Sequence, residues 1–421
     1  MIKEMLPSIA YSILQIYMII VTSYFVVTGI LGFRKPKQLP NVEPNKRFLI
    51  LVPAHNEASV IGGIAENLKH LDYPDELYDA IIIADGCTDD TATIVRKIGL
   101  KALEHTYLPG EHKGKPYAIR YALEQISDYE ARYDGVCICD ADNLVSLNFL
   151  KEMNKHLSAG QQLVQCYLDT KNPMGNWVSL SFATNFYYMN RSCQLARTHW
   201  KLGASLGGTG FCIGTKLLKK IGWTANSLTE DLEFQIQTVL GGEKAHWCHT
   251  ARVYDEKPTS FKASCEQRSR WARGHWELIF KFAPSLLVKA IKERSIIALD
   301  TLFYSLNPLH MLVGGIMMVF GAIALAVGYP LNSLIPIHPM IRNILMIIPY
   351  ILIVFSILKD VQKPKLKLLG AIAMPIFNLT YIPIVFWALL TRKNRIWKRT
   401  EHSKNIALDL ELDAIKVKNK N

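Results

Sequence analysis

Hydrophobic residues gather in four long stretches that separate a polar central part of the chain from both ends. These stretches cover residues 9–32, 298–327, 343–358 and 366–390. Each is close to or above the roughly 20 residues that an α-helix needs to cross a bilayer. The pattern predicts one membrane helix before the central part and three apolar segments after it.

The first stretch, residues 9–32, could alternatively be a cleaved signal peptide. A cleaved signal peptide carries its positive charges before the apolar stretch and a small-residue cleavage site after it. Here Arg34, Lys35 and Lys37 follow the stretch, and no such cleavage site is evident. We therefore favour an uncleaved membrane helix over residues 1–34.

Short apolar runs alternate with amphipathic runs in the central part. The runs at 48–52, 80–84 and 135–139 predict buried strands. An amphipathic helix follows the first run, and its inner face consists of Val60, Ile61, Ile64, Leu68 and Leu71. Strands followed by helices predict an α/β fold, with a mostly parallel sheet and helices on both of its faces.

Polar residues follow each of the three predicted strands. They are His55 to Glu57 after the first, Asp85 after the second, and Asp140 to Asp142 after the third. Because ligands of such sheets bind beyond the carboxyl ends of the strands, we expect these residues to share one site. We also expect Thr88 to cap the helix after the second strand, with Asp89 and Asp90 in its first turn.

Asp140 and Asp142 are candidates for a divalent metal site. Hard cations such as Mg²⁺ are usually held by one or two carboxylates together with substrate phosphates. A metal there would neutralise the charge that develops on a departing diphosphate. Two aspartates one residue apart are common in proteins, so the prediction depends on their position at a strand end.

Residues 261–282 predict a helix on which Gln267, Arg270 and Trp271 share a face, because positions i, i+3 and i+4 are neighbours. A guanidinium fork suits a diphosphate, and an indole suits the face of a sugar ring. A lone tryptophan is by default a core or interface residue, and its polar neighbours favour a functional role here. The end of this helix, residues 276–282, suits a membrane interface.

Another helix is expected to begin near Thr229 and to end at the glycines at 241 and 242. Glu230 and Asp231 in its first turn complement the helix dipole. A carboxylate can also accept the proton of an attacking sugar hydroxyl, and we favour Asp231 for this role. Gly208, Thr209 and Gly210 form either a turn or a backbone wall beside an acceptor.

The net charge of +12 does not indicate nucleic acid, because no nucleic-acid-binding module is recognisable. Six basic residues fall within 391–404, beside the last apolar stretch. A basic segment next to a membrane helix is typical of a cytoplasmic flank in contact with anionic lipids. All eight cysteines lie between the first two apolar stretches without zinc-site spacing, which favours reduced thiols in a cytosolic domain.

We therefore predict four parts: an N-terminal membrane helix (1–34), a cytosolic α/β domain with interfacial helices at its end (35–295), a C-terminal membrane region (296–391) and a basic tail (392–421). One span before the domain and three after it would place the tail outside the cell. The basic residues of the tail favour the inside. One of the last apolar segments is therefore expected to be interfacial or re-entrant.

The ordered motifs resemble the membrane-embedded processive branch of family 2 glycosyltransferases, which includes cellulose, chitin, hyaluronan and poly-N-acetylglucosamine synthases. The resemblance covers about residues 45 to 285. It rests on Pro53-Ala54-His55-Asn56-Glu57, Asp85 through Asp89, Gly114-Lys115, Asp140-Ala141-Asp142, Gly208-Thr209-Gly210, Thr229-Glu230-Asp231 and Gln267-Arg268-Ser269-Arg270-Trp271.

This resemblance implies a GT-A fold, a UDP-sugar donor, Mg²⁺ or Mn²⁺, and an inverting reaction that gives a β-linked product. The implied donor-binding residues are Ala54, Glu57, Asp85, Lys115, Asp140, Gln267 and Arg270, and the implied metal ligands are Asp142 and Asp140. Asp231 is the implied general base beside Glu230, and Gly208, Thr209, Gly210 and Trp271 are the implied acceptor residues. Residues 396–400 loosely resemble a cytoplasmic gating segment.

The chain departs from the family pattern in two ways. Lys115 is followed by Pro116 instead of a small residue. The few membrane segments also suggest that a homo-oligomer or a secretion partner completes any polymer channel. No cyclic-dinucleotide-binding domain is recognisable.

Together these features predict a multi-pass enzyme of the cell membrane that extends a β-linked polysaccharide at the cytosolic face, using a UDP-hexose or UDP-N-acetylhexosamine. One alternative is a non-processive transferase that adds a single sugar to a lipid. Another is a catalytically silent scaffold that binds a nucleotide sugar, although the intact set of acids argues against it.

Overall fold

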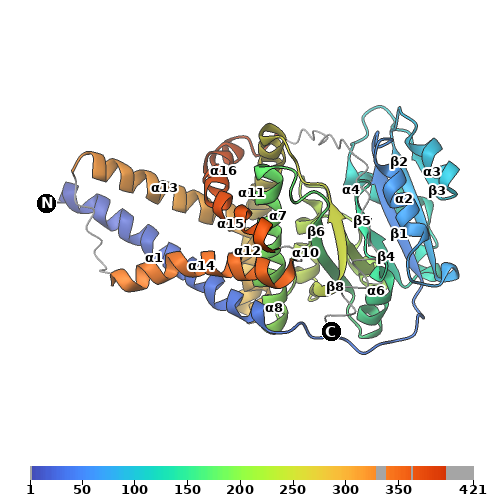
Figure 1. The fold of residues 1–421 in the computed structure, drawn as a ribbon, viewed down its shortest axis with the longest axis horizontal. Helices are drawn as coiled ribbons and strands as arrows, with labels where there is room; N and C mark the ends of the chain where they lie inside the picture. Colours follow the sequence, from blue (N-terminus) through green and yellow to red (C-terminus); the bar gives the residue numbers. More distant parts are fainter. Residues whose placement is uncertain (1, 329–337, 362–363, 395–421) are drawn as a thin grey trace.

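The computed structural model describes residues 2–328, 338–361 and 364–394. Its centre is an eight-stranded sheet with the strand order β3-β2-β1-β4-β7-β6-β8-β5 (Figure 1). The strands are β1 (Phe48–Ala54), β2 (Tyr78–Asp85), β3 (Lys101–His105), β4 (Gly135–Ile138), β5 (Leu144–Val145), β6 (Leu163–Thr170), β7 (Phe211–Gly214) and β8 (His246–Asp255). The three strands that the apolar runs predict are confirmed as β1, β2 and β4.

The sheet is mixed. Strands β3, β2, β1 and β4 are parallel, and β8 is parallel to β6. Strand β7 is antiparallel to both β4 and β6, and β5 is antiparallel to β8. The predicted α/β class is confirmed, and the antiparallel strand β7 lies between β4 and β6 and joins the two halves of the sheet.

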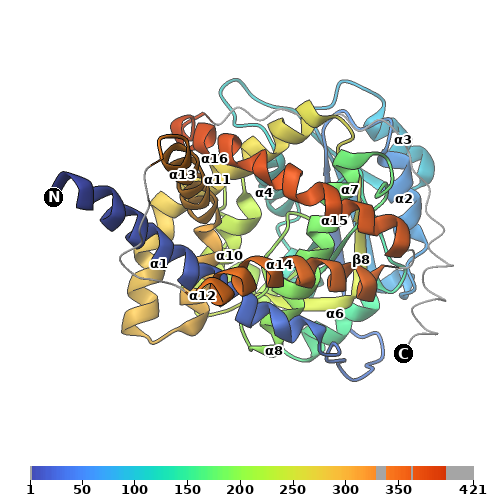
Figure 2. The ribbon, with the colours of Figure 1, turned by 60° about the vertical axis from the view of Figure 1, so that its left-hand side comes forward.

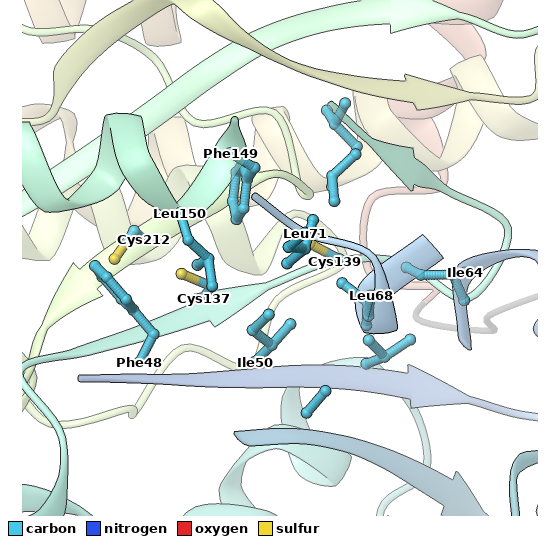
Figure 3. Close-up of a cluster of buried hydrophobic side chains, with 14 of the residues drawn as sticks. Phe48, Ile50, Ile64, Leu68, Leu71, Cys137, Cys139, Phe149, Leu150 and Cys212 are labelled. Carbon is cyan, nitrogen blue, oxygen red and sulfur yellow. The ribbon is translucent and has the colours of Figure 1, made fainter. Parts of the chain in front are cut away.

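Helices cover both faces of the sheet because β1 and β2 are buried on both sides. In β1, Phe48 and Ile50 face the core beneath α2 (Ile61–Lys69) and α6 (Phe149–Ser158), as Figure 3 shows. Leu49 and Leu51 face the opposite core, beneath α4 (Lys115–Gln125). The remaining helices beside the sheet are α3 (Thr91–Ile98), α5 (Tyr129–Arg132), α9 (Thr215–Ile221) and α10 (Glu230–Leu240).

The prediction for the start of α3 is wrong. The helix begins at Thr91 rather than after Thr88. The carboxylate of Asp89 accepts hydrogen bonds from the backbone and the hydroxyl of Thr91, at 3.0 and 2.5 Å. Thr88 instead donates its backbone N–H to Asn56, which links the ends of β1 and β2. The helix beginning after Thr229 is confirmed as α10.

A second group of helices lies at the other end of the molecule from β3. It consists of α1 (Ile2–Ile30), α7 (Trp177–Tyr188), a π-helical turn (Met189–Leu195), α8 (Ala196–His199), α11 (Phe261–Lys292), α12 (Ile296–Ser305), α13 (Asn307–Ala326), α14 (Pro339–Asp360), α15 (Pro364–Leu379) and α16 (Tyr381–Leu390). Helix α11 runs ten residues beyond the predicted end at Phe282. The stretch 298–327 is not one segment, because the chain breaks at Leu306 between α12 and α13.

Four segments are long and apolar enough to cross a membrane: Pro7–Phe33, Asn307–Ala326, Asn343–Asp360 and Leu368–Leu390. Helices α1, α13 and α14 project away from the sheet (Figure 1). Helices α15 and α16, which hold the fourth segment, lie instead across α7 and α11 (Figure 2).

Both ends of the α15–α16 segment contact the central domain. At the end of α14, just before α15, the carboxylate of Asp360 pairs with Arg191 of the π-helical turn. After α16, the backbone carbonyl of Asn394 accepts a hydrogen bond from Arg273 of α11 at 3.1 Å. The segment therefore begins and ends against elements that lie within residues 35–295.

Candidate active site

A cavity of about 1390 Å³ lies between the carboxyl ends of β1, β2 and β4 and the helices α10 and α11. All but one of the predicted site residues line it. Those in its wall are Ala54, Glu57, Asp85, Lys115, Asp140, Asp142, Gly208, Thr209, Glu230, Asp231, Gln267, Arg270 and Trp271. Residues more than 200 positions apart along the chain therefore face one space.

Gly210 is the exception, and it supports the sheet instead. Its backbone N–H donates to the carbonyl of Ile138 at 2.9 Å. Its φ angle is +62°, and a Cβ atom there would lie 2.6 Å from Cys166 and from Val253. A glycine is required at this position because of packing, so its predicted role in acceptor binding has no support from the geometry.

The turn after β4 is held by Thr209. The backbone N–H of Asp140 donates to the Thr209 hydroxyl at 3.0 Å, and this hydroxyl also bonds the side chain of Asn143. The amide of Asn143 in turn donates to Asp142 at 3.2 Å. The buried side chain of Thr209 thus positions the two aspartates, which is a different task from the predicted contact with an acceptor.

Lys115 connects the strand ends with α10. Its Nζ atom donates to Asp140 Oδ1 and to the carbonyl of Gly208, both at 2.5 Å, and lies 3.7 Å from Glu230 Oε1. Burial alone would lower the pKa of Lys115, but Asp140 and Glu230 raise it above its ordinary value. Lys115 is therefore a permanent cation among carboxylates.

Asp231 has the electrostatic character of a base. Burial, together with the negative charge of Glu230, raises the pKa of Asp231 to about 7, although Lys115 and Arg270 act in the opposite direction. General bases work best when their pKa lies near the working pH. The first turn of α10 therefore provides a carboxylate that can take up a proton near neutral pH.

Gln267, Arg270 and Trp271 face the cavity from α11, as their helical spacing predicts. Arg268 lies in the same wall, but its guanidinium contacts the break between α15 and α16. Its fully buried guanidinium donates to the Thr380 hydroxyl at 2.7 Å and lies 4.2 Å from the ring centre of Phe377. Contacts with α15 and α16 thereby help to position the neighbouring residues of α11.

His105 and Tyr107, which hydrogen-bond the side chain of Asp85, are not predicted from the sequence. Both oxygens of Asp85 accept hydrogen bonds, one from His105 at 2.8 Å and the other from Tyr107. His105 ends β3, an edge strand whose Lys and Glu residues hide it from a search for apolar runs. Had β3 been predicted, the rule that ligands bind at strand ends would have found both residues.

Five buried polar atoms in residues of the cavity wall have no hydrogen-bond partner among the described residues. They are Ser227 Oγ, Thr229 Oγ1, Asp255 Oδ1, Gln267 Oε1 and His275 Nδ1. Leaving a buried polar group unpaired costs roughly 1–3 kcal/mol. Such a cost is offset when a polar ligand supplies the partners, so the cavity suits a ligand rich in hydroxyl and phosphate groups.

The chemistry of the wall also fits a divalent metal. Within residues 2–328, 338–361 and 364–394, no three Asp, Glu, His or Cys side chains gather into a closed metal site. However, Asp140 and Asp142 offer oxygen ligands, and the buried Oδ1 of Asp255 lacks a partner nearby in the same wall. Two carboxylates completed by substrate phosphates are the usual arrangement for Mg²⁺.

Comparison with known proteins agrees with this geometry. A solved mannosyltransferase, PcManGT from Pyrobaculum calidifontis in complex with GDP-Man and Mn²⁺, superimposes with a TM-score of 0.55 at 17% identity and covers 89% of this chain and 99% of that one. At this identity the likeness shows the fold alone, which is of the GT-A type. Residues 44–274, more than half of the chain, match the family described as glycosyltransferase like family 2, so the protein belongs to this family of transferases.

Several characterised or named relatives are similar in sequence. The probable glycosyltransferase YdaM of Bacillus subtilis is 24% identical, covering 92% of this chain and 94% of its own length. The poly-β-1,6-N-acetyl-D-glucosamine synthase of Staphylococcus aureus is 25% identical, covering 64% of each chain. The β-monoglucosyldiacylglycerol synthase of Synechocystis is 26% identical over 56% of this chain and 49% of its own.

The contact between α10 and α11 predicts that Gly274→Ala impairs the protein. A Cβ atom at Gly274 would lie 2.5 Å from the Thr229 hydroxyl, immediately before Glu230 and Asp231. Overpacking of this kind costs roughly 1–3 kcal/mol. We expect a lower unfolding temperature in detergent and a reduced rate of sugar transfer. Gly62→Ala, in α2, is the control, because its Cβ would have only an ordinary contact at 3.9 Å.

Proposed function

We propose that the protein is a membrane-bound inverting glycosyltransferase that uses a UDP-sugar to extend a β-linked glycan at the cytosolic face of the cell membrane. One observation carries the proposal. Asp142 from the turn after β4, Asp231 from α10 and Trp271 from α11 line a single cavity, together with Gln267 and Arg270.

Each residue would have a distinct role in transfer. Asp231 would accept the proton of the acceptor hydroxyl as this hydroxyl attacks the anomeric carbon. Gln267 and Arg270 would hold the diphosphate, because a guanidinium fork matches its oxygens. The indole of Trp271, packed edge-on against Phe182, would present its face to the acceptor sugar. Preorganised charge of this kind is often the largest contribution to catalysis.

Asp142 and Asp140 would hold Mg²⁺ or Mn²⁺ beside the diphosphate. When bound, the metal supplies positive charge that stabilises the departing nucleoside diphosphate. The side chains of Ala54, Glu57 and Asp85 lie at the ends of β1 and β2, which is the side left for the nucleoside.

The acceptor is the least constrained part of the proposal. The cavity continues between membrane-proximal helices, with side chains from α1, α13, α14, α15 and α16 in its wall. Asn185, Asn307 and Asn378 lie there and suit sugar hydroxyls. The apolar side chains of Phe25 and Ile353 favour a second candidate, transfer of one sugar to a lipid. Relatives of both kinds, a polysaccharide synthase and a glycolipid synthase, share the family.

The path of the chain supports a cytosolic tail. If α1, α13 and α14 cross the membrane, the start of α15 returns to the side of the central domain. Since α15 and α16 begin and end in contact with that domain, they would be re-entrant or interfacial rather than a fourth span. The tail would then lie inside, as its basic residues favour. The gating segment expected at 396–400 lies outside the described residues.

The donor can be identified with the purified protein in lipid. We expect release of UDP from one of a panel of UDP-sugars in the presence of Mn²⁺ or Mg²⁺, and no release of GDP from GDP-mannose. Asp142→Ala should lower this release at least a hundredfold, because it removes a metal ligand. Mass analysis of the product separates a polymer from a glycolipid. Unchanged turnover in Asp142→Ala would contradict the placement of the metal.

The environment of Asp231 predicts the pH dependence of transfer. A base must be deprotonated, so kcat/KM should fall as the pH drops through about 7, which is the pKa of Asp231. Glu230→Gln removes a neighbouring negative charge and thus lowers the pKa of Asp231. The acidic limb of the profile should then move to lower pH by roughly one pH unit. A profile that stays in place would show that another group is the base.

A further inference from the structure

The ammonium group of Lys115 contacts Asp140, one of the two proposed metal ligands. This group has three N–H donors and no acceptor. In the structure it donates to Asp140 and to the carbonyl of Gly208, both at 2.5 Å, and it lies 3.7 Å from Glu230. The residue that the family resemblance implies for the uridine portion therefore neutralises a carboxylate of the proposed metal site.

A divalent cation and this ammonium group compete for the same carboxylate. Two positive charges within a few ångströms of one oxygen repel each other strongly in a partly buried site. The side chain of Lys115 is only 20% exposed, so water screens this repulsion poorly. A metal that takes Oδ1 of Asp140 would displace Lys115 from this oxygen.

A diphosphate bound near the start of α4 would give Lys115 another partner. Lys115 is the first residue of α4, and residues 112–117 line the cavity. A lysine on its flexible stem is a common phosphate ligand. Pro116 is tolerated beside it because its position in the first turn of α4 needs no N–H donor. A diphosphate held at this point would be within the reach of Lys115.

The overall charge of the cavity also requires cations. Among the described residues, its wall contains eight Asp or Glu residues and four Lys or Arg residues. An anionic diphosphate entering without a metal would meet this excess of carboxylates. A donor that arrives with a divalent cation would avoid that repulsion.

We propose that the ammonium group of Lys115 takes the place of the metal beside Asp140 when no donor is bound. Metal binding would then depend on the nucleotide. Without donor, Lys115 neutralises Asp140 and Glu230 and excludes the metal. When the nucleotide sugar enters, the metal takes Asp140 and Lys115 moves to the diphosphate. The inference rests on the proposed function, because it takes the donor and the metal from it.

Binding of Mn²⁺ tests the inference without any measurement of activity. The affinity can be measured by electron paramagnetic resonance on the purified full chain in lipid nanodiscs, with and without UDP. We expect UDP to tighten Mn²⁺ binding to the wild type at least tenfold. We expect Lys115→Met to bind Mn²⁺ about tenfold more tightly than the wild type without UDP, because the competing charge is gone.

Lys113→Met is the matched control. Lys113 lies in the same loop and lines the same cavity, but its Nζ atom lies over the ring of Tyr107, at 5.0 Å, and not on a carboxylate. It should bind Mn²⁺ within two- to threefold of the wild type, which separates a local exchange from a general change of charge. Lys115→Gln, which keeps an N–H donor for Gly208, is a second neutral variant with the same expected result if Lys115→Met does not fold.

The outcomes separate a failure of the role of Lys115 from a failure of the proposed function. Weaker or unchanged Mn²⁺ binding in the neutral Lys115 variants would overturn the inference, as would a wild type that binds Mn²⁺ equally well with and without UDP. A wild type that binds no Mn²⁺ under either condition and releases no nucleotide from any donor would instead contradict the proposed function. Turnover with normal metal dependence, combined with unchanged binding in Lys115→Met, would leave the function intact and remove only the role of Lys115.

Discussion

Carboxylates from two separate parts of the chain meet at one end of the sheet, and their mutual repulsion is balanced by a lysine from a third part. Asp140 follows β4, Glu230 and Asp231 begin α10, and Lys115 begins α4 between them. Burial, followed by the charge of Glu230, raises the pKa of Asp231, and the same buried negative charge would attract a metal and a guanidinium. The buried carboxylates would therefore act in the reaction only when a diphosphate and a cation bind.

The membrane-proximal helices take part in this arrangement. Arg268 is buried against Phe377 and Thr380, so the break between α15 and α16 holds the middle of α11 in place. Gly274, two turns further on, lets α11 approach the first turn of α10 closely. Asp231 on α10 and the residues Gln267 and Arg270 on α11 are thus positioned by packing that extends from the sheet to α15 and α16. These contacts reach beyond residue 274, where the matched family domain ends.

The local pattern of apolar and polar residues predicts much of this fold. It fails where the position of an element or residue depends on contacts with residues far away in the sequence. The apolar runs of β1, β2 and β4 are recognisable because both of their faces are buried, and the acids that end them indicate the site. Strand β3 is missed because an edge strand with Lys101 and Glu104 has no apolar run. Hydropathy marks α15–α16 as long and apolar enough for a span, but it does not reveal that α15 packs on α7 and α16 on α11. The positions of Lys115 and Gly210 follow from contacts with residues at least 25 and more than 40 positions away, which motif order does not reveal.

The central claim is that one pocket holds the nucleotide, the metal and the acceptor side of the reaction. It is tested most directly by a crystal structure with bound UDP and Mn²⁺, in which anomalous scattering locates the metal. The account predicts a manganese peak beside Asp142 and a diphosphate within hydrogen-bond distance of Arg270 and Gln267, with Asp231 facing the space next to it. A nucleotide bound in a different cavity, or a metal remote from both strand-end aspartates, would contradict it.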